Sequence, residues 1–207
     1  RLELKQLGMT LANRNIISEL IRKPHGIILV TGPTGSGKTT TLYACVQQID
    51  RRRRHVLTIE DPIEYHLSGV VQTQVEEKKG YTFESGLRAA LRQDPDIIMV
   101  GEIRDGEVGE IAVEAALTGH LVLSTLHTND APSTITRLVN MGIEPFLVAA
   151  SLNIVVAQRL CRRICKQCKD VDKNVTHDML VACGVSPASA TKITVYKGKG
   201  CPFCNET

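Results

Sequence analysis

A glycine-rich turn between an apolar run and a helix-forming stretch limits the fold more than any other feature of the sequence. Residues 27–30 read Ile-Ile-Leu-Val, which is typical of a buried strand in a parallel sheet. Residues 32–39 follow as Gly-Pro-Thr-Gly-Ser-Gly-Lys-Thr, and a helix is expected from about residue 38 to residue 49. Strand, glycine turn and helix in this order predict an α/β protein.

Strands and helices alternate along the following part of the chain. Further strands are expected over residues 55–59, 97–100 and 121–126, with a short strand or hairpin arm over residues 70–75. Helices are expected over residues 11–21, 105–117, 131–141 and 145–160, and between a capping Thr82 and Pro95. This alternation predicts a parallel-rich sheet flanked by helices on both faces.

The glycine-rich turn fits the pattern G-x-x-x-x-G-K-[S/T], whose backbone N–H groups surround the β-phosphate of a nucleotide. Lys38 is expected to reach the β- and γ-phosphates, and the Thr39 hydroxyl is expected to bind Mg²⁺. An ordinary glycine turn is the alternative, but the strand before it and the helix after it favour ATP. The residues expected to contact ATP are Gly32, Pro33, Thr34, Gly35, Ser36, Gly37, Lys38, Thr39 and Thr40.

Two expected strands end in carboxylates. Glu102 follows the apolar run 97–100 after one glycine, as in a Walker B segment, and Glu60 follows the strand over residues 55–59. Carboxyl ends of parallel strands line the ligand-binding edge of such a sheet. Either glutamate is a candidate general base or ligand of the Mg²⁺ site, and a solvated acidic loop is the alternative for each.

Two histidines frame the strand expected over residues 121–126. His120 precedes it and His127 ends it, so alternation along the strand directs them to opposite faces and argues against one shared metal. A neutral His127 near the γ-phosphate could sense it by hydrogen bonding. A structural histidine is the alternative.

Two Cys-x-x-Cys pairs near the end of the chain predict a metal site. The seven cysteines are an odd number, which argues against a closed set of disulfides. Four thiolates in two such pairs are the usual ligands of a structural Zn²⁺ and leave no open position for catalysis. Cys161 and Cys183 are rival ligands, and reduced cysteines without metal are the alternative. The expected zinc ligands are Cys165, Cys168, Cys201 and Cys204.

The composition changes near residue 160, where cysteine and basic residues become frequent. We therefore expect an ATPase core over residues 1–160 and a tetracysteine zinc element over residues 161–207, which is too short for an independent core. No apolar run approaches the roughly 20 residues that span a bilayer. A net charge of +3 and an aromatic content of 3% do not favour a nucleic-acid partner.

Arginines are candidates for stabilising charge on a transferring phosphate. Arg88, Arg92, Arg104 and Arg159 could each act in this way, and the sequence does not choose among them. Residues 51–54 are four consecutive arginines, interpreted as a solvated loop, with a subunit or acidic-lipid contact as the alternative.

Five segments occur in the order GPTGSGKTT, TIEDPIEY, LRQDPDIIMVGEIRD, LTGHLVLSTLHTND and AQRL. Together they resemble the secretion ATPase superfamily that drives type IV pilus assembly and type II secretion, over about residues 8–207. The resemblance implies a RecA-like P-loop core with Walker A, Asp box, Walker B and His box segments. It implies that Glu60 and Glu102 serve the attacking water and the metal, and that His120, His127 and Arg159 belong to the nucleotide site.

The resemblance further implies a ring hexamer that hydrolyses ATP and moves a platform protein of the bacterial inner membrane. The protein would then act at the cytoplasmic face of that membrane, without inserting into it and without a nucleic-acid partner. Residues 162–168 and 196–201 look more like pilus assembly than type II secretion. We therefore expect an ATP-driven motor for type IV pilus assembly, with a type II secretion ATPase as the alternative.

Two other functions belong to different classes. A nucleic-acid-dependent ATPase would respond to DNA or RNA with a strong salt dependence. A structural subunit would bind ATP without turning it over, which the acids at both strand ends disfavour. Because the family carries another domain before this one and continues after the second cysteine pair, the chain is expected to be a fragment that hydrolyses ATP poorly alone.

Overall fold

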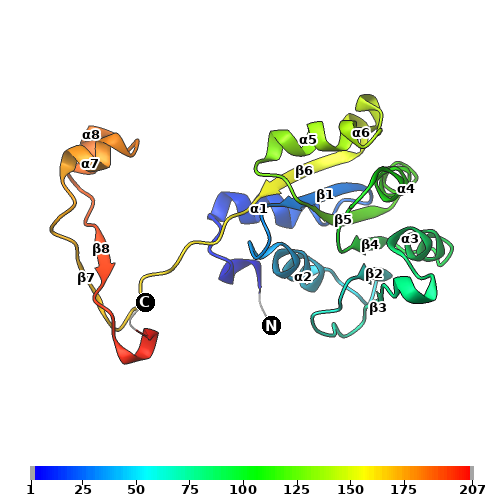
Figure 1. The fold of residues 1–207 in the computed structure, drawn as a ribbon, viewed down its shortest axis with the longest axis horizontal. Helices are drawn as coiled ribbons and strands as arrows, with labels where there is room; N and C mark the ends of the chain where they lie inside the picture. Colours follow the sequence, from blue (N-terminus) through cyan, green and yellow to red (C-terminus); the bar gives the residue numbers. More distant parts are fainter. Residues whose placement is uncertain (1–2, 206–207) are drawn as a thin grey trace. The chain divides into compact units, whose positions relative to one another are not determined.

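A six-stranded parallel sheet forms the centre of the larger of two units (Figure 1). The computed structural model describes residues 3–205, and the chain divides into one unit up to Leu160 and another from Cys161. The strand order is β3-β2-β4-β5-β1-β6, and every neighbouring pair is parallel. The strands are β1 (Gly26–Thr31), β2 (Val56–Glu60), β3 (Val71–Gln74), β4 (Ile97–Val100), β5 (Leu121–Leu126) and β6 (Leu152–Ala157).

Helices cover both faces of the sheet, which explains why β1 is apolar at consecutive positions. Ile27 and Leu29 pack into a core with α3, α4, α5 and α6, whereas Ile28 and Val30 pack into a second core with α1 and α2 (Figure 1). The helices are α1 (Leu11–Leu20), α2 (Lys38–Gln48), α3 (Phe83–Leu91), α4 (Gly106–Leu117), α5 (Ala131–Asn140) and α6 (Pro145–Ser151), with 3₁₀ turns η1 (Leu4–Gln6) and η2 (Glu77–Lys79). Throughout residues 3–205, no helix combines the length and apolar character needed to cross a bilayer.

The α/β fold with a parallel sheet between helices is confirmed, but the single helix expected over residues 145–160 is wrong. α6 ends at Ser151, and β6 follows at once as a strand paired with β1. The β-branched run 154–156 suits a strand better than a helix, and β1 provides the hydrogen-bonding edge for it. Arg159 therefore follows an edge strand and does not lie on a helix.

The second unit contains little regular structure and almost no core. β7 (Lys169–Val171) and β8 (Tyr196–Gly198) pair in antiparallel fashion, alongside α7 (His177–Ala182), α8 (Pro187–Ala190) and the 3₁₀ turn η3 (Pro202–Cys204). Within the described residues 161–205, Ala190 is the single buried residue. Hydrophobic burial of this extent does not hold a fold of this size, so a covalent or metal cross-link is required.

Candidate functional site

The carboxyl ends of the parallel strands open onto a cleft of about 660 Å³. β1 leads into the glycine-rich turn, and β2, β4 and β5 end in or just before acidic or histidine side chains at the same edge of the sheet. In open α/β sheets this edge is where ligands bind. The predicted site residues that line the cleft are Thr34, Gly35, Ser36, Gly37, Lys38, Thr39, Thr40, Glu60, Glu102 and His127.

The glycine-rich turn has the backbone conformation that its glycines permit. Gly35 and Gly37 have φ values of 75° and 83°, in the left-handed region that side chains disfavour. Gly37 is the N-cap of α2 and has no side chain to bond the first N–H groups of that helix. These donors and the positive end of the helix dipole form an anion-binding arrangement at the cleft.

Lys38 is folded back over this turn. Its Nζ atom donates hydrogen bonds to the carbonyl oxygens of Gly32 and Pro33 at 3.1 and 3.2 Å, and the residue is 8% exposed. Burial lowers the pKa of Lys38, and the carboxylate of Glu102 opposes this shift. The ammonium group thus donates to uncharged carbonyl oxygens. Anionic oxygens at the same place would accept stronger, charge-assisted hydrogen bonds from it.

Gln158 holds the turn in place from the end of β6, a role that no sequence pattern indicated beyond its place in the segment AQRL. Its backbone N–H donates to Thr31 at 2.8 Å, and its Nε2 atom donates to the carbonyl of Ser36 at 2.6 Å. The Thr41 hydroxyl donates to its Oε1 atom at 2.7 Å. A Cβ atom on Gly32 would lie 2.4 Å from the Gln158 carbonyl, so glycine is required there.

Glu60 is buried at the end of β2, with hydrogen-bond donors on both carboxylate oxygens. Tyr43 donates its hydroxyl to Oε2, while the Thr58 hydroxyl and Gln72 Nε2 donate to Oε1 at 2.5 and 3.0 Å. Burial, and then the hydrogen bond to Glu60, raise the pKa of Tyr43 far above its usual range, so the phenol stays protonated as a donor. The sequence predicted Glu60 but gave no indication of Tyr43.

Glu102 lies opposite, between a histidine and an arginine. His127 Nε2 is 3.0 Å from Glu102 Oε2, and Arg104 donates from Nε to Glu102 Oε1. Arg104 also donates to Asp61 Oδ2 at 2.9 Å and stands 5.1 Å from the centre of the Phe83 ring. The hydrogen bond to Glu102 is the largest cause that raises the pKa of Arg104. The hydrogen bond to Asp61 and the negative charges of both carboxylates raise it further. One guanidinium therefore orders two acidic loops.

Two predicted nucleotide contacts lie away from the cleft. His120 precedes β5 and so lies at the opposite edge of the sheet from His127, with Nδ1 3.0 Å from the Ala115 carbonyl. Strand direction explains this separation, because a residue before a parallel strand cannot reach the edge where the strand ends. Arg159 donates to the carbonyl of Asn129 at 2.7 Å and lines a neighbouring cavity instead.

The two remaining predicted nucleotide contacts, Gly32 and Pro33, belong to the glycine-rich turn and contribute the carbonyl oxygens that accept hydrogen bonds from Lys38.

The other predicted arginines lie in ordinary surface contacts. Arg88 pairs with Glu84 of its own helix at 2.8 Å, and Arg92 is the C-cap of α3. In the run over residues 51–54, Arg51 and Arg54 donate to the backbone carbonyls of Ser68 and Lys23.

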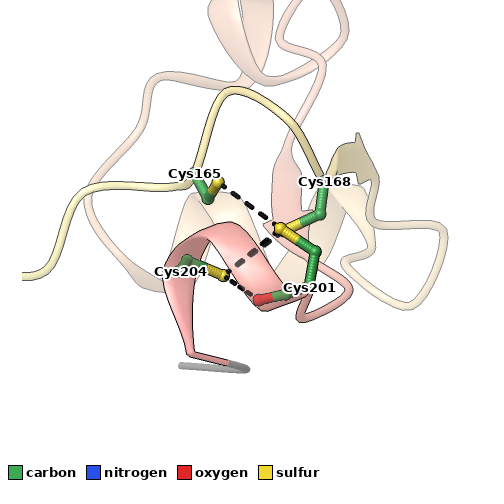
Figure 2. A group of neighbouring side chains, drawn as sticks. All are labelled: Cys165, Cys168, Cys201 and Cys204. Carbon is green, nitrogen blue, oxygen red and sulfur yellow. Dashed lines mark hydrogen bonds between the residues drawn. The ribbon is translucent and has the colours of Figure 1, made fainter.

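Figure 2 shows the four predicted zinc ligands converging from the two Cys-x-x-Cys segments. All four sulfur atoms lie within 4.8 Å of one another, with pairs at 3.7, 3.9 and 4.0 Å. Tetrahedral coordination with metal–sulfur bonds of about 2.3 Å places sulfurs about 3.8 Å apart, so the donor set fits Zn²⁺. Cys161 and Cys183 are exposed and belong to no such group among the described residues. The four cysteines could hold a metal ion.

The amino-acid sequence is similar to secretion and pilus proteins along its whole length. It is 62% identical over 207 residues to type II secretion system protein E of Aeromonas hydrophila, covering 100% of this chain and 41% of that protein. It is 52% identical over 206 residues to the type IV pilus assembly ATPase PilB of Myxococcus xanthus, covering 100% and 36%. The chain thus spans about two fifths of the length of these curated relatives.

The fold is similar to that of a solved pilus protein. The pilus retraction motor PilT, with bound ADP, superposes with a TM-score of 0.68 at 42% identity, covering 76% of this chain and 48% of that one. Residues 1–207 also match the family described as type II/IV secretion system protein. The chain belongs to the type II/IV secretion system protein family.

Proposed function

We propose that this chain is the nucleotide-hydrolysing part of an ATPase that powers type II secretion. The observation that carries the proposal is the meeting of the glycine-rich turn, Glu60, Glu102 and His127 on one cleft. Phosphoryl transfer to water needs a phosphate cradle, a metal-binding group and a carboxylate that directs the water, and this cleft supplies all three.

Each side chain has a role in the proposal. Lys38 and the N–H groups at the start of α2 hold the phosphates, and Thr39 binds the Mg²⁺ that accompanies them. Glu102 projects into the cleft and acts on the metal or the attacking water, oriented by Arg104. His127 contacts the γ-phosphate side and reports its presence to Glu102. The buried Glu60 has its oxygens engaged by donors, which suits a fixed negative charge beside the water. His120 has no part in this assignment.

Sequence similarity to known proteins favours type II secretion. The motifs considered in the sequence analysis had instead favoured pilus assembly. Identity is 62% to a type II secretion protein E and 52% to a pilus assembly ATPase. Type IV pilus assembly is retained as the second candidate because of the latter relative. The remaining proposals follow the family: a hexamer in the complete protein, action on a membrane platform protein at the cytoplasmic face of the inner membrane, and Zn²⁺ as the ion of the four cysteines.

The enzymatic proposal is tested by phosphate release from ATP at rising protein concentration. Glu102→Gln and Glu60→Gln should each lower turnover by about 10²- to 10⁴-fold, because each removes a carboxylate that acts on water or metal. Glu110→Gln, on the exposed face of α4, is the matched control and should leave turnover unchanged. Undiminished turnover in Glu102→Gln would contradict the proposal. Tight ATP binding without turnover at any concentration would favour a nucleotide-binding subunit.

The two cellular roles are separated by complementation. The complete gene should restore protein secretion to a bacterium lacking its own type II secretion ATPase, and its Lys38→Ala variant should not. Restoration of surface pili in a strain lacking its pilus assembly ATPase, without restored secretion, would select the second candidate.

A further inference from the structure

We propose that Thr31, the residue immediately before the glycine-rich turn, is a positioning residue for His127; this inference rests on the proposed function. Thr31 ends β1 and pairs with Leu126, the last residue of β5. His127 follows Leu126 directly. The side chain of Thr31 therefore lies beside the backbone that carries the histidine into the cleft.

The place of Thr31 in β1 is one where the other side chains are apolar. Alternation along the strand puts it on the same face as Ile27 and Leu29, which pack into the core with α3, α4, α5 and α6. Thr31 is 0% exposed. Burying a hydroxyl group costs free energy unless the group is hydrogen-bonded, so its partners indicate what the hydroxyl does.

The hydroxyl of Thr31 bonds the backbone on both sides of His127. Its oxygen accepts a hydrogen bond from the backbone N–H of Thr128 at 2.9 Å. Its proton faces the carbonyl oxygen of Leu126 at 2.9 Å and that of Thr128 at 3.1 Å. One side chain thus holds the residue before the histidine and the residue after it, and the backbone of His127 lies between these two points.

Thr128 extends the connection to α5. Its hydroxyl shares hydrogen bonds of 2.6 Å with the hydroxyls of Thr31 and Thr134. Thr134 is fully buried on α5 and also donates to the carbonyl of Asp130 at 3.1 Å. The loop that follows His127 is therefore attached to β1 on one side and to α5 on the other.

The ring of His127 depends on this attachment because it has few contacts of its own. Its side chain is 51% exposed, and within residues 3–205 the ring bonds only to Glu102, at 3.0 Å. A side chain that acts on a phosphate does so only when it is held in the right place. Since Thr31 adjoins Gly32, its hydroxyl fixes the histidine relative to the start of the phosphate loop.

The hydrogen bond is tested without nucleotide by hydrogen exchange, resolved at single amides by NMR. Thr31→Val keeps the shape of the side chain without the hydroxyl, and should raise the exchange rate of the Thr128 amide by at least about tenfold. Thr31→Ser keeps the hydroxyl and should keep the protection. Ser124→Ala removes another buried hydroxyl, which donates to the Val100 carbonyl at 2.8 Å, and is the matched control that should leave this amide unchanged. Unchanged protection of the amide in Thr31→Val would overturn the proposal.

The effect on the reaction is measured as turnover, separately from binding. Thr31→Val and Thr128→Val should each lower kcat by about 10- to 100-fold. Affinities for ATP and for inorganic tripolyphosphate, which has the phosphates but no base, should stay as in the native chain. Thr31→Ser should retain native turnover. In a His127→Ala background neither valine should lower kcat further, because both act through that ring.

The outcomes separate the inference from the function on which it rests. Loss of tripolyphosphate binding in Thr31→Val would assign the hydroxyl to the phosphate loop, and an equal loss of turnover with and without His127 would assign it to folding. Either result, or native turnover in Thr31→Val, would overturn the positioning role. Absence of turnover in the native chain would overturn the proposed function instead. The response of the His127 ring resonances to ATP would then decide the inference, and an identical response in the native chain and in Thr31→Val would overturn it.

Discussion

Replacing Gln158 by alanine should loosen the phosphate loop without unfolding the sheet. The change removes the bond to the Ser36 carbonyl and the bond from the Thr41 hydroxyl, at 2.6 and 2.7 Å. Leaving a mostly buried carbonyl without its donor costs about 1–3 kcal/mol, and the second bond contributes about 1 kcal/mol. Thr41 keeps its bond to the Gly37 carbonyl, so its hydroxyl is not stranded.

These terms give a penalty of about 2–4 kcal/mol on the loop conformation that binds phosphate. If the nucleotide requires that conformation, its affinity falls by about 30- to 700-fold, because each 1.4 kcal/mol corresponds to a factor of ten. Isothermal titration with ATP and with tripolyphosphate measures the loss, which should be equal for the two ligands since both depend on the loop.

Two variants isolate the cause of the loss. Gln158→Met keeps the length of the side chain but not its hydrogen bonds, and should weaken binding as alanine does. Gln93→Ala, in the exposed turn after α3, should have no effect. Unchanged affinity in a folded Gln158→Ala protein would refute the argument that this side chain orders the loop.

Three further perturbations follow from contacts in the structure. Tyr43→Phe should lower the free energy of unfolding in urea by about 2 kcal/mol, since it removes a buried hydrogen bond to the Glu60 carboxylate. Tyr81→Phe breaks a bond to the uncharged Thr73 hydroxyl and should cost less. Equal losses in the two variants would contradict the role of the Glu60 charge. As pH rises, tripolyphosphate affinity should begin to fall at a lower pH than a lysine with the usual pKa of about 10.4 would produce. Burial lowers the pKa of Lys38, so the loop loses its ammonium charge earlier. Lys38→Arg should flatten that fall, and an identical fall in the variant would assign it to another group. Chelation of the metal, or Cys168→Ser, should raise the rate of hydrogen exchange throughout residues 169–200 while ATP binding by the larger unit persists. Cys183→Ser is the control and should leave exchange unchanged. Unchanged exchange after chelation would show that no metal holds the smaller unit.

The sequence predicted the parts of the site that depend on local spacing and on sheet direction. The glycine pattern placed the loop between β1 and α2, and the rule that ligands bind where parallel strands end brought Glu60, Glu102 and His127 to it. The same rule, applied to His120, would have kept it out of the site. The spacing of four cysteines was enough to expect their meeting, although they come from segments more than thirty residues apart.

What could not be predicted depends on contacts between distant segments. The β-branched residues within 152–157 favour a strand, but a short apolar run directly after a helix can also continue that helix, and only the pairing with β1 distinguishes the two. Gln158 and Tyr43 acquire their roles only from the loop and the carboxylate that the fold brings against them. Glutamine and tyrosine carry no spacing signal comparable to paired cysteines.

The near absence of a core in the smaller unit has an evolutionary consequence. With Ala190 alone fully buried among the described residues from 161 to 205, most substitutions there remove no packing and leave no void. Natural selection for folding then acts mainly on the four sulfurs and on the turns that aim them. Packing therefore constrains the remaining positions little, whereas two packed cores constrain the larger unit.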